Sequence, residues 1–289
     1  MKAYQDIVRR ILNEGVRKKN RTGVDAITIA GAMFEHDMST GFPLLTTKKI
    51  PFRLVASELE FFIRGITDKQ WLQSRGNHIW DEWCSPDIIG YGHDDITKQN
   101  MRGERDLGPI YGWQWRHFGS VYDGCNFPPT RHTGVDQLRQ VVERLHRDPS
   151  DRRMIVSAWN PLDISHMALP PCHYAFQVTM IEGRLNLLWN QRSVDTALGL
   201  PFNIASYGLL LHLLAKEAGL KEGKLIGFLA DTHIYVNHIE GLQWQLEREP
   251  RCLPRVETTP FSSIFEWEYS DTKLVGYEPH PKIAFEIAV

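Results

Sequence analysis

The sequence has 289 residues, of which 42% are hydrophobic and 24% are charged, and its formal net charge is -2. These values are ordinary for a globular protein, and they exclude a surface with the excess of basic residues that generic DNA binding needs. Four cysteines without a CxxC pair argue against a zinc site or a disulfide framework, and no apolar run is long enough to span a membrane.

The first residues are charged and contain no apolar stretch of the kind found in signal peptides, so we expect a cytoplasmic protein. Glycine and proline are spread along the chain rather than gathered in a linker. We therefore expect residues 1–289 to form one domain.

Apolar spacing predicts the elements of the first half. A helix is predicted over 4–12, with Gly15 as its stop, and a strand over 26–38, where branched residues are frequent. Pro51 is suited to the first turn of a helix that continues through 55–63. The polar segment 84–105 is predicted to be a surface insertion.

The second half is predicted to mix helices and strands. The predicted helices cover 134–145, 206–220 and 237–248, and the predicted strands cover 154–158, 174–181, 184–189 and 225–229. Because the two kinds of element do not alternate regularly, we predict the α+β class rather than a doubly wound sheet.

Cys172 is the first candidate for chemistry, because it follows Pro170 and Pro171 and precedes His173. A lone cysteine among apolar residues is usually an inert core residue. The two prolines, however, would fix where the thiol points, and nearby arginines could stabilise the thiolate and raise its nucleophilicity. The pattern therefore indicates an activated thiolate beside an anion.

A set of arginines and one hydroxyl is the second candidate. Scattered surface arginines are common, but several guanidinium groups and a hydroxyl are what a phosphate monoester dianion needs. In this sequence the candidates lie in predicted loops or at the ends of apolar segments: Arg21, Arg152, Arg153, Arg192 and Ser193.

Three further positions each have two interpretations. Glu58 is either solvated on a helix or buried, in which case its pKa would rise and suit proton transfer. Trp80 and Trp83 are either core residues or a flat wall for a heteroaromatic ligand. Asn203 either caps a helix or presents a donor and an acceptor to a pyrimidine edge.

Taken together, these segments resemble the thymidylate synthase family over almost the whole chain. Each motif is short, but ten of them in the family's order make a specific match. The matching motifs are Arg21-Thr22-Gly23, Thr46-Thr47-Lys48, Ile79-Trp80-Asp81-Glu82-Trp83, Asp106-Leu107-Gly108-Pro109, Arg152-Arg153, Leu169-Pro170-Pro171-Cys172-His173, Gln191-Arg192-Ser193-Val194-Asp195, 198–207, Asp231-Thr232-His233-Ile234-Tyr235 and 276–281.

The resemblance implies a large mixed β-sheet flanked by helices, in a homodimer whose sheets pack back to back. It implies reductive methylation of deoxyuridylate (dUMP) to thymidylate (dTMP), with methylene-tetrahydrofolate as both carbon donor and reductant. No metal is implied, and neither is a membrane partner.

The resemblance also implies a role for each matching residue. Cys172 would add to C6 of uracil and Glu58 would transfer protons, and the rest of the implied catalytic set is Tyr111, His173, Arg192 and Asp195. The implied nucleotide-binding residues are Arg21, Arg152, Arg153, Gln191, Arg192, Ser193, Asn203, His233 and Tyr235. The implied folate-binding residues are Lys48, Ile79, Trp80, Trp83, Asp195, Leu198, Gly199, Phe202, Ala288 and Val289. Arg152 and Arg153 would reach the other subunit's site, and Ala288-Val289 would close over the folate.

Two other functions stay open at this point. A pyrimidine nucleotide hydroxymethylase would share the nucleophile and the phosphate site but quench the methylene intermediate with water, and Asn203 would favour uracil over cytosine as its base. A catalytically silent nucleotide- or RNA-binding protein is the third function, and the intact Cys172, Arg192 and Glu58 argue against it.

Overall fold

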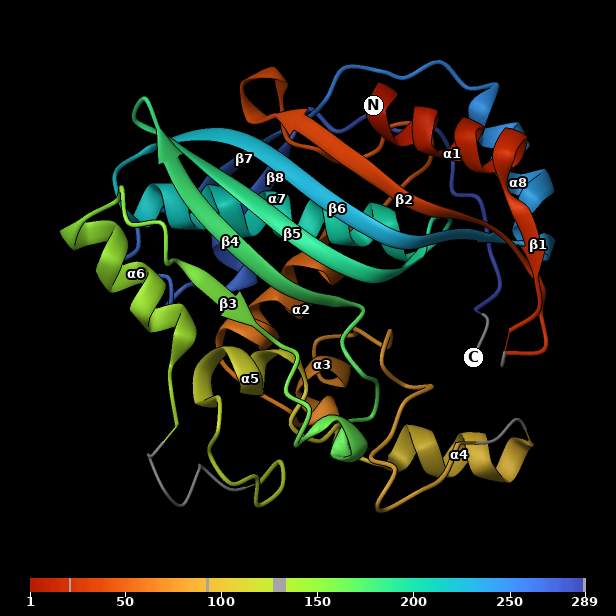
Figure 1. Ribbon diagram of the computed structural model, residues 1–289, viewed down its shortest axis with the longest axis horizontal. Coiled ribbons are helices and arrows are strands. Elements are labelled where there is room, and N and C mark those ends of the chain that lie inside the picture. Colours follow the sequence, from red (N-terminus) through yellow and green to blue (C-terminus); the bar gives the residue numbers. More distant parts are fainter. Residues whose placement is uncertain (21, 92–93, 127–133, 288–289) are drawn as a thin grey trace.

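A six-stranded sheet runs through the middle of the protein (Figure 1). The computed structural model describes residues 1–20, 22–91, 94–126 and 134–287. Within these residues the strand order is β1-β2-β6-β5-β4-β3, and β5 and β6 are the one parallel pair. The strands are β1 (Val16–Lys18), β2 (Ala26–Asp37), β3 (Ile155–Ser157), β4 (His173–Ile181), β5 (Arg184–Asp195) and β6 (Lys221–Tyr235), and a separate hairpin consists of β7 (Arg255–Thr258) and β8 (Thr272–Val275).

Helices flank the sheet, which confirms the α+β prediction. They are α1 (Lys2–Glu14), α2 (Phe52–Ile63), α3 (Lys69–Gln73), α4 (Asp95–Gly103), α5 (Tyr111–His117), α6 (Gln137–Arg147), α7 (Gly199–Glu217) and α8 (Ile239–Leu246). Short 3-10 turns are η1 (Met38–Thr40), η2 (Ile164–His166), η3 (Val236–His238) and η4 (Tyr269–Asp271). None of the described helices is both long and apolar enough to cross a bilayer.

The core lies between the sheet and α7, which runs along one face of β5 and β6 (Figure 1). Successive side chains of a strand point to opposite faces, so Leu187 and Trp189 are buried while Leu188 and Asn190, which alternate with them, are only half-buried. Almost every residue of α7 between 200 and 215 is buried, as expected for a helix that is apolar on all sides.

The parallel pairing of β5 and β6 decides where polar side chains gather. Parallel strands end at the same edge of a sheet, and here Ser193 lies opposite Asp231 while Asp195 lies opposite His233. β4 enters at the same edge, where His173 pairs with Gln191. One edge of the sheet therefore collects side chains from three strands.

The opposite face of the sheet carries exposed apolar side chains. Met33 on β2 is 59% exposed and lies directly across from Phe228 on β6, which is 44% exposed. Phe228 in turn lies beside Asn190 of β5. Ile155 and Ile181 add further exposed apolar surface on β3 and β4.

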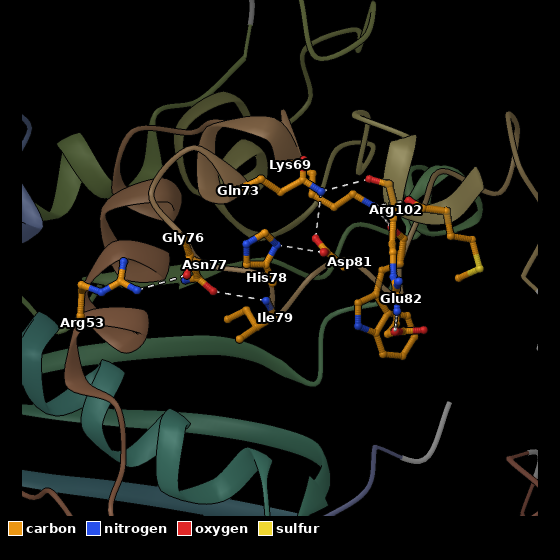
Figure 2. Close-up of polar contacts among 12 residues, drawn as sticks. Arg53, Lys69, Gln73, Gly76, Asn77, His78, Ile79, Asp81, Glu82 and Arg102 are labelled. Atoms are coloured by element: carbon orange, nitrogen blue, oxygen red, sulfur yellow. Dashed lines mark hydrogen bonds and ion pairs between the residues drawn. The ribbon is translucent and has the colours of Figure 1, made fainter. Parts of the chain in front are cut away.

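The segment 84–105, predicted as a surface insertion, contains α4 and is anchored at both ends. Cys84 and Met101 are buried. The buried Lys69 ammonium donates to the carbonyls of Trp83 (2.6 Å) and Met101 (2.5 Å). In Figure 2, Gln73 Nε2 donates to Asp81 Oδ1 (2.9 Å) and to the Arg102 carbonyl (3.0 Å). α3 thus holds both ends of this segment against the protein.

Several predicted boundaries were wrong. The strand predicted over 184–189 continues to Asp195, and the strand predicted over 225–229 covers all of 221–235. The helix predicted over 206–220 begins at Gly199, so Asn203 lies inside it rather than ahead of it. Arg192 and Ser193 are accordingly strand residues and not loop residues.

Candidate active site

A cavity of about 1250 Å³ opens at the polar edge of the sheet. Its walls come from the ends of β5 and β6, from the segment 159–172, from β1 and β2, and from the α4 segment. The residues with reactive or charged side chains on its walls include Cys172, Arg192, Ser193, Asp231, His233 and Tyr235. The cavity brings together residues that lie more than fifty positions apart in the sequence.

Cys172 lies where the segment 159–172 enters β4, and its main chain is fixed on both sides. The Cys172 N–H donates to the Tyr111 hydroxyl at 2.8 Å, and the Cys172 carbonyl accepts from the Arg192 N–H at 2.8 Å. The Arg192 guanidinium donates to the carbonyls of Pro170 (2.8 Å) and Pro171 (3.0 Å). The thiol is therefore presented to the cavity on a rigid main chain.

Glu58 and Trp80 form a hydrogen-bonded pair beside Tyr111, and neither is among the residues that line the cavity. Trp80 Nε1 donates to Glu58 Oε1 at 2.8 Å. Glu58 keeps part of its surface accessible, yet burial raises its pKa to about 7, and the indole hydrogen bond offsets only part of that rise. A carboxyl group with such a pKa can both donate and accept a proton near neutral pH.

His173 is buried among aromatic side chains and is neutral. Its ring lies 4.4 Å from that of Tyr111, centroid to centroid, and its Nδ1 is 2.9 Å from the Tyr207 hydroxyl. Burial lowers the pKa of His173 to about 3, because an imidazolium here would lose its hydration. Burial also raises the pKa of Tyr111 well above its usual value, so its hydroxyl keeps its proton.

An amide pair lies at the junction of β5 and α7. Gln191 Nε2 donates to Asn203 Oδ1 at 3.1 Å and to the Ser193 carbonyl at 3.0 Å. Gln191 Oε1 in turn accepts from the indole of Trp189 at 3.1 Å. Since Gln191 is fixed by these contacts, it sets the orientation of the Asn203 amide.

The folate-binding candidates from β5 and α7 gather around the start of that helix. Asp195 Oδ1 accepts from the N–H groups of Ala197 (3.0 Å) and Leu198 (3.1 Å). The Lys48 ammonium donates to the Ala197 carbonyl. Burial lowers the pKa of Lys48 to about 8, although the charge of Asp195 opposes this shift. Leu198 directly precedes this helix, and Gly199 and Phe202 lie in its first turn.

Other predicted site residues are placed less centrally. Ile79 is half-buried beside the core, and Trp83 lines the cavity. Arg152 and Arg153 are exposed just before β3, away from the described cavity walls, and Arg153 is paired with Asp151 at 2.9 Å. Arg21, Ala288 and Val289 lie outside the described residues.

Asp231 and Lys18 are two charged residues of the cavity wall that were not predicted as site residues, and Glu82, Lys98 and Glu286 are three more. Asp231 accepts hydrogen bonds from Lys18 Nζ (2.7 Å) and the Thr28 hydroxyl (2.9 Å), and it lies 3.1 Å from His233 Nδ1. Asp231 directly follows an apolar strand segment, and His233 lies two residues further on. A polar residue at the end of an apolar strand was the signal from which Asp231 could have been predicted as a site residue. Lys18 on the short strand β1 gave none.

Comparisons with known proteins agree on one family. Residues 2–289 match the family model described as "Thymidylate synthase". A curated relative, the "Bifunctional dihydrofolate reductase-thymidylate synthase" of Paramecium tetraurelia, is 44% identical over 286 residues. These residues are 99% of this chain but 61% of that relative, so the chain spans about three fifths of the relative's length.

Proposed function

This chain belongs to the thymidylate synthase family, and from that premise we propose that it converts dUMP to dTMP with methylene-tetrahydrofolate as co-substrate. The observation that carries the proposal is the fixed position of Cys172 on the wall of a cavity that also holds Arg192, Ser193, His233 and Tyr235. A nucleophile, anion-binding groups and sugar-binding groups thus share one site.

In the proposed reaction, the Cys172 thiolate adds to C6 of the uracil ring, and the displaced π electrons make C5 nucleophilic. After C5 has bonded to the one-carbon unit and lost its proton to a base of the site, elimination breaks the Sγ–C6 bond and regenerates the thiolate. The main-chain hydrogen bonds of Cys172 to Tyr111 and Arg192 keep the sulfur within reach of the ring. The folate, when bound, supplies the one-carbon unit and the hydride, and the reaction calls for no metal.

Glu58 is proposed to move protons at the uracil ring through water. Its pKa of about 7 suits that role, and its hydrogen bond to Trp80 fixes the carboxyl group in one orientation. His173, neutral at all physiological pH values, can only act as a hydrogen-bonding or packing group beside Tyr111. This division of roles follows from the opposite effects of burial on an acid and a base.

The nucleotide is proposed to be held at three points. Arg21, Arg192 and Ser193 would bind its phosphate, His233 and Tyr235 its deoxyribose hydroxyl, and Asn203, oriented by Gln191, its uracil edge. Fork-shaped guanidinium groups and a hydroxyl match a phosphate dianion. The amide of Asn203 can both donate and accept, as the uracil edge requires.

The folate is proposed to lie across the start of α7. Asp195, Leu198, Gly199 and Phe202 would contact it there, with Lys48, Ile79, Trp80 and Trp83 completing the pocket. The C-terminal Ala288-Val289 would close over it and exclude water. Glu286 and Ile287 already line the cavity, which supports this role for the tail.

We propose a homodimer in which the exposed apolar face of the sheet is buried. Met33 and Phe228, side by side on β2 and β6, would lie in the interface. In this arrangement Arg152 and Arg153 of one protomer would add to the phosphate site of the other. The free thiols of Cys84, Cys125 and Cys252 fit a reducing compartment, so we propose the cytoplasm as the location.

The test is to incubate the purified protein with dUMP and methylene-tetrahydrofolate and to follow dihydrofolate by absorbance. We expect dihydrofolate to form together with a methylated nucleotide, identified by mass. Tetrahydrofolate with a hydroxymethyl nucleotide would instead assign the chain to hydroxymethylase chemistry. Cys172→Ala is expected to abolish turnover while nucleotide binding survives, and retained turnover would rule out the covalent route.

A further inference from the structure

His238 is a fully buried imidazole that contacts the C-terminal segment. It ends η3, between β6 and α8, and its Nε2 lies 2.7 Å from the main-chain oxygen of Glu286. A carbonyl oxygen can only accept, so Nε2 carries the proton. Since Glu286 and Ile287 line the cavity, this hydrogen bond fixes the tail at the point where it reaches the site.

The other ring nitrogen faces the folate-binding candidate Asp195. His238 Nδ1 lies 4.0 Å from Asp195 Oδ1, and it has no hydrogen-bond partner among the described residues. This separation is too long for a direct hydrogen bond. One water molecule between the two groups, hydrogen-bonded to each, would satisfy both.

Phe285 fixes the same part of the tail by packing. Its ring lies 5.0 Å from that of His238, and the Lys48 ammonium lies 4.6 Å from its centroid. Gly241 of α8 approaches so closely that a Cβ there would lie 2.6 Å from Phe285 Cε1. Lys48 also donates to the Ala197 carbonyl, in the turn that Asp195 caps. The tail and the turn that Asp195 caps are therefore both in contact with Lys48.

We propose that His238 is a positioning residue that couples docking of the tail, residues 285–287, to the orientation of Asp195. A single rigid ring contacts the tail through one nitrogen and faces the carboxylate through the other. The inference rests on the proposed function, in which Asp195 contacts the folate and the tail excludes water. His238 itself touches no reacting atom.

Two substitutions of His238 each keep one of the two contacts of the ring and remove the other. The side-chain amide of His238→Gln can reach the Glu286 carbonyl, whereas the shorter amide of His238→Asn occupies only the Nδ1 position. We expect His238→Asn to raise the folate KM about tenfold, as the loss of one buried hydrogen bond would. It should also release some hydroxymethyl nucleotide, because water enters, while the dUMP KM stays unchanged. His238→Gln, whose amide reaches the Glu286 carbonyl but no longer faces Asp195, should keep the tail docked and release only the methyl product, while its folate KM still rises several-fold.

A second readout reports the tail without depending on activity. Carboxypeptidase should remove the C-terminal residues several-fold faster from His238→Asn than from the wild type or from His238→Gln. Gly241→Ala should do the same, because its new Cβ displaces Phe285 without altering the imidazole, and alanine suits a helix interior. His146→Asn, at an exposed site beside Glu217, is the matched control and should change nothing.

The proposal is overturned if the Asn and Gln variants behave alike in both assays, or if the tail of His238→Asn stays as protected as that of the wild type. A dUMP KM that rises together with the folate KM would also overturn it, since the substitution would then act on the nucleotide through Tyr235, whose ring packs on that of His238. Absence of dihydrofolate with the wild-type protein would instead refute the proposed function, and the protease assay would still report whether His238 holds the tail.

Discussion

Two groups of the site, the half-buried Glu58 and the buried His173, have pKa values displaced in opposite directions from their usual ranges. Glu58 titrates at about 7 and His173 at about 3, and burial is the main cause of both shifts. The same desolvation keeps the acid protonated and the base neutral. The site thus contains one group that can exchange protons near neutral pH and one that cannot.

Glu58→Gln is expected to lower kcat by about 10² to 10⁴-fold, the usual contribution of a positioned general acid or base. The pH profile of kcat should also lose its inflection near pH 7, because that inflection belongs to the Glu58 carboxyl group. Steady-state rates between pH 5.5 and 9 provide the measurement, because this range covers about 1.5 units below and 2 units above the expected pKa. An unchanged inflection in the Gln variant would assign the titration to another group.

Glu58 and His173 should also make the free energy of unfolding depend on pH in opposite directions. The folded state keeps His173 neutral, so its contribution is complete above pH 6.5 and is lost as pH falls toward 3. The folded state keeps Glu58 protonated, so its contribution is complete below pH 4.5 and is lost as pH rises toward 7. Each slope is at most about 1.4 kcal/mol per pH unit, and that of Glu58 is smaller because part of it is exposed.

On acidification from pH 7 to pH 4.5, the free energy of unfolding of His173→Asn is therefore expected to fall less than that of the wild type. That of Glu58→Gln is expected to fall more. Urea unfolding at several pH values measures both differences. Profiles of the two variants that run parallel to the wild type would contradict the assignment of these shifts to burial.

At the scale of the element, the turn 106–110 supports the segment that carries Cys172. Gly108 has a φ of +72°, and a Cβ on it would lie 2.0 Å from the His166 carbonyl oxygen. The Leu107 carbonyl also accepts from the Ala168 N–H at 2.9 Å. The close approach of the two main chains leaves room for glycine alone.

Gly108→Ala is expected to destabilise the protein by more than about 2 kcal/mol and to lower kcat, because it combines a strained φ with a steric clash against the segment before Cys172. Gly183→Ala is the matched control. Gly183 also has a φ of +72°, but nothing lies within 4 Å of its Cβ position. Its cost should be about 1 kcal/mol, with kcat unchanged. Equal losses in the two variants, measured by urea unfolding, would show that only backbone strain matters.

Helices and strands with a clear apolar periodicity were predicted well. Segments that are polar, or whose structure depends on contacts with distant parts of the chain, were not. The helix predicted over 4–12 is observed as α1, because its apolar stripe packs against β2. The strand over 184–189 was ended too early because residues 190–195 are mostly polar. Their pairing with β6 overrides weak local propensity. Likewise α7 begins with Gly199 and Pro201, which suggest a turn, although proline is tolerated in a first helical turn.

The candidate site was predicted as a set of residues but not as a set of contacts. The motif around Cys172 indicated the nucleophile, because its residue types carry the chemistry. Nothing local indicated that Lys48 would meet the Ala197 carbonyl or that His238 would face Asp195, since these contacts join positions far apart in the chain. The helix α4 was also missed, because Met101 is its one buried residue.

At the scale of the whole molecule, the proposed dimer makes each site depend on two chains. A protein with Cys172→Ala lacks the nucleophile, and one with Arg152→Ala and Arg153→Ala lacks the cations that the partner would supply. Mixed dimers of the two would contain one intact site. We expect random subunit exchange to restore about a quarter of wild-type activity, because half of the dimers are mixed and each has one working site.

Phe228→Lys provides the control for this experiment. It introduces a charge at the centre of the exposed sheet face, and burying an unpaired ammonium there is strongly unfavourable. Introduced into either inactive protein, Phe228→Lys should keep that protein monomeric and prevent the rescue. Ile96→Lys, at another exposed aliphatic position (74%), should leave both assembly and rescue intact. Rescue that persists when the inactive proteins carry Phe228→Lys would contradict the proposed interface.

The pairing of β2 with β6 has a consequence for synthesis on the ribosome. Met33 pairs with Phe228, and the Tyr4 hydroxyl donates to the Thr196 carbonyl 192 residues later in the chain. At translation rates of about 5 to 20 residues per second, α1 and β2 wait roughly 10 to 40 s for their partners to emerge. During that interval the nascent chain presents the apolar stripe of α1 and the edge of β2 that later pairs with β6, so we expect its early folding in the cell to depend on chaperones that cover such surfaces.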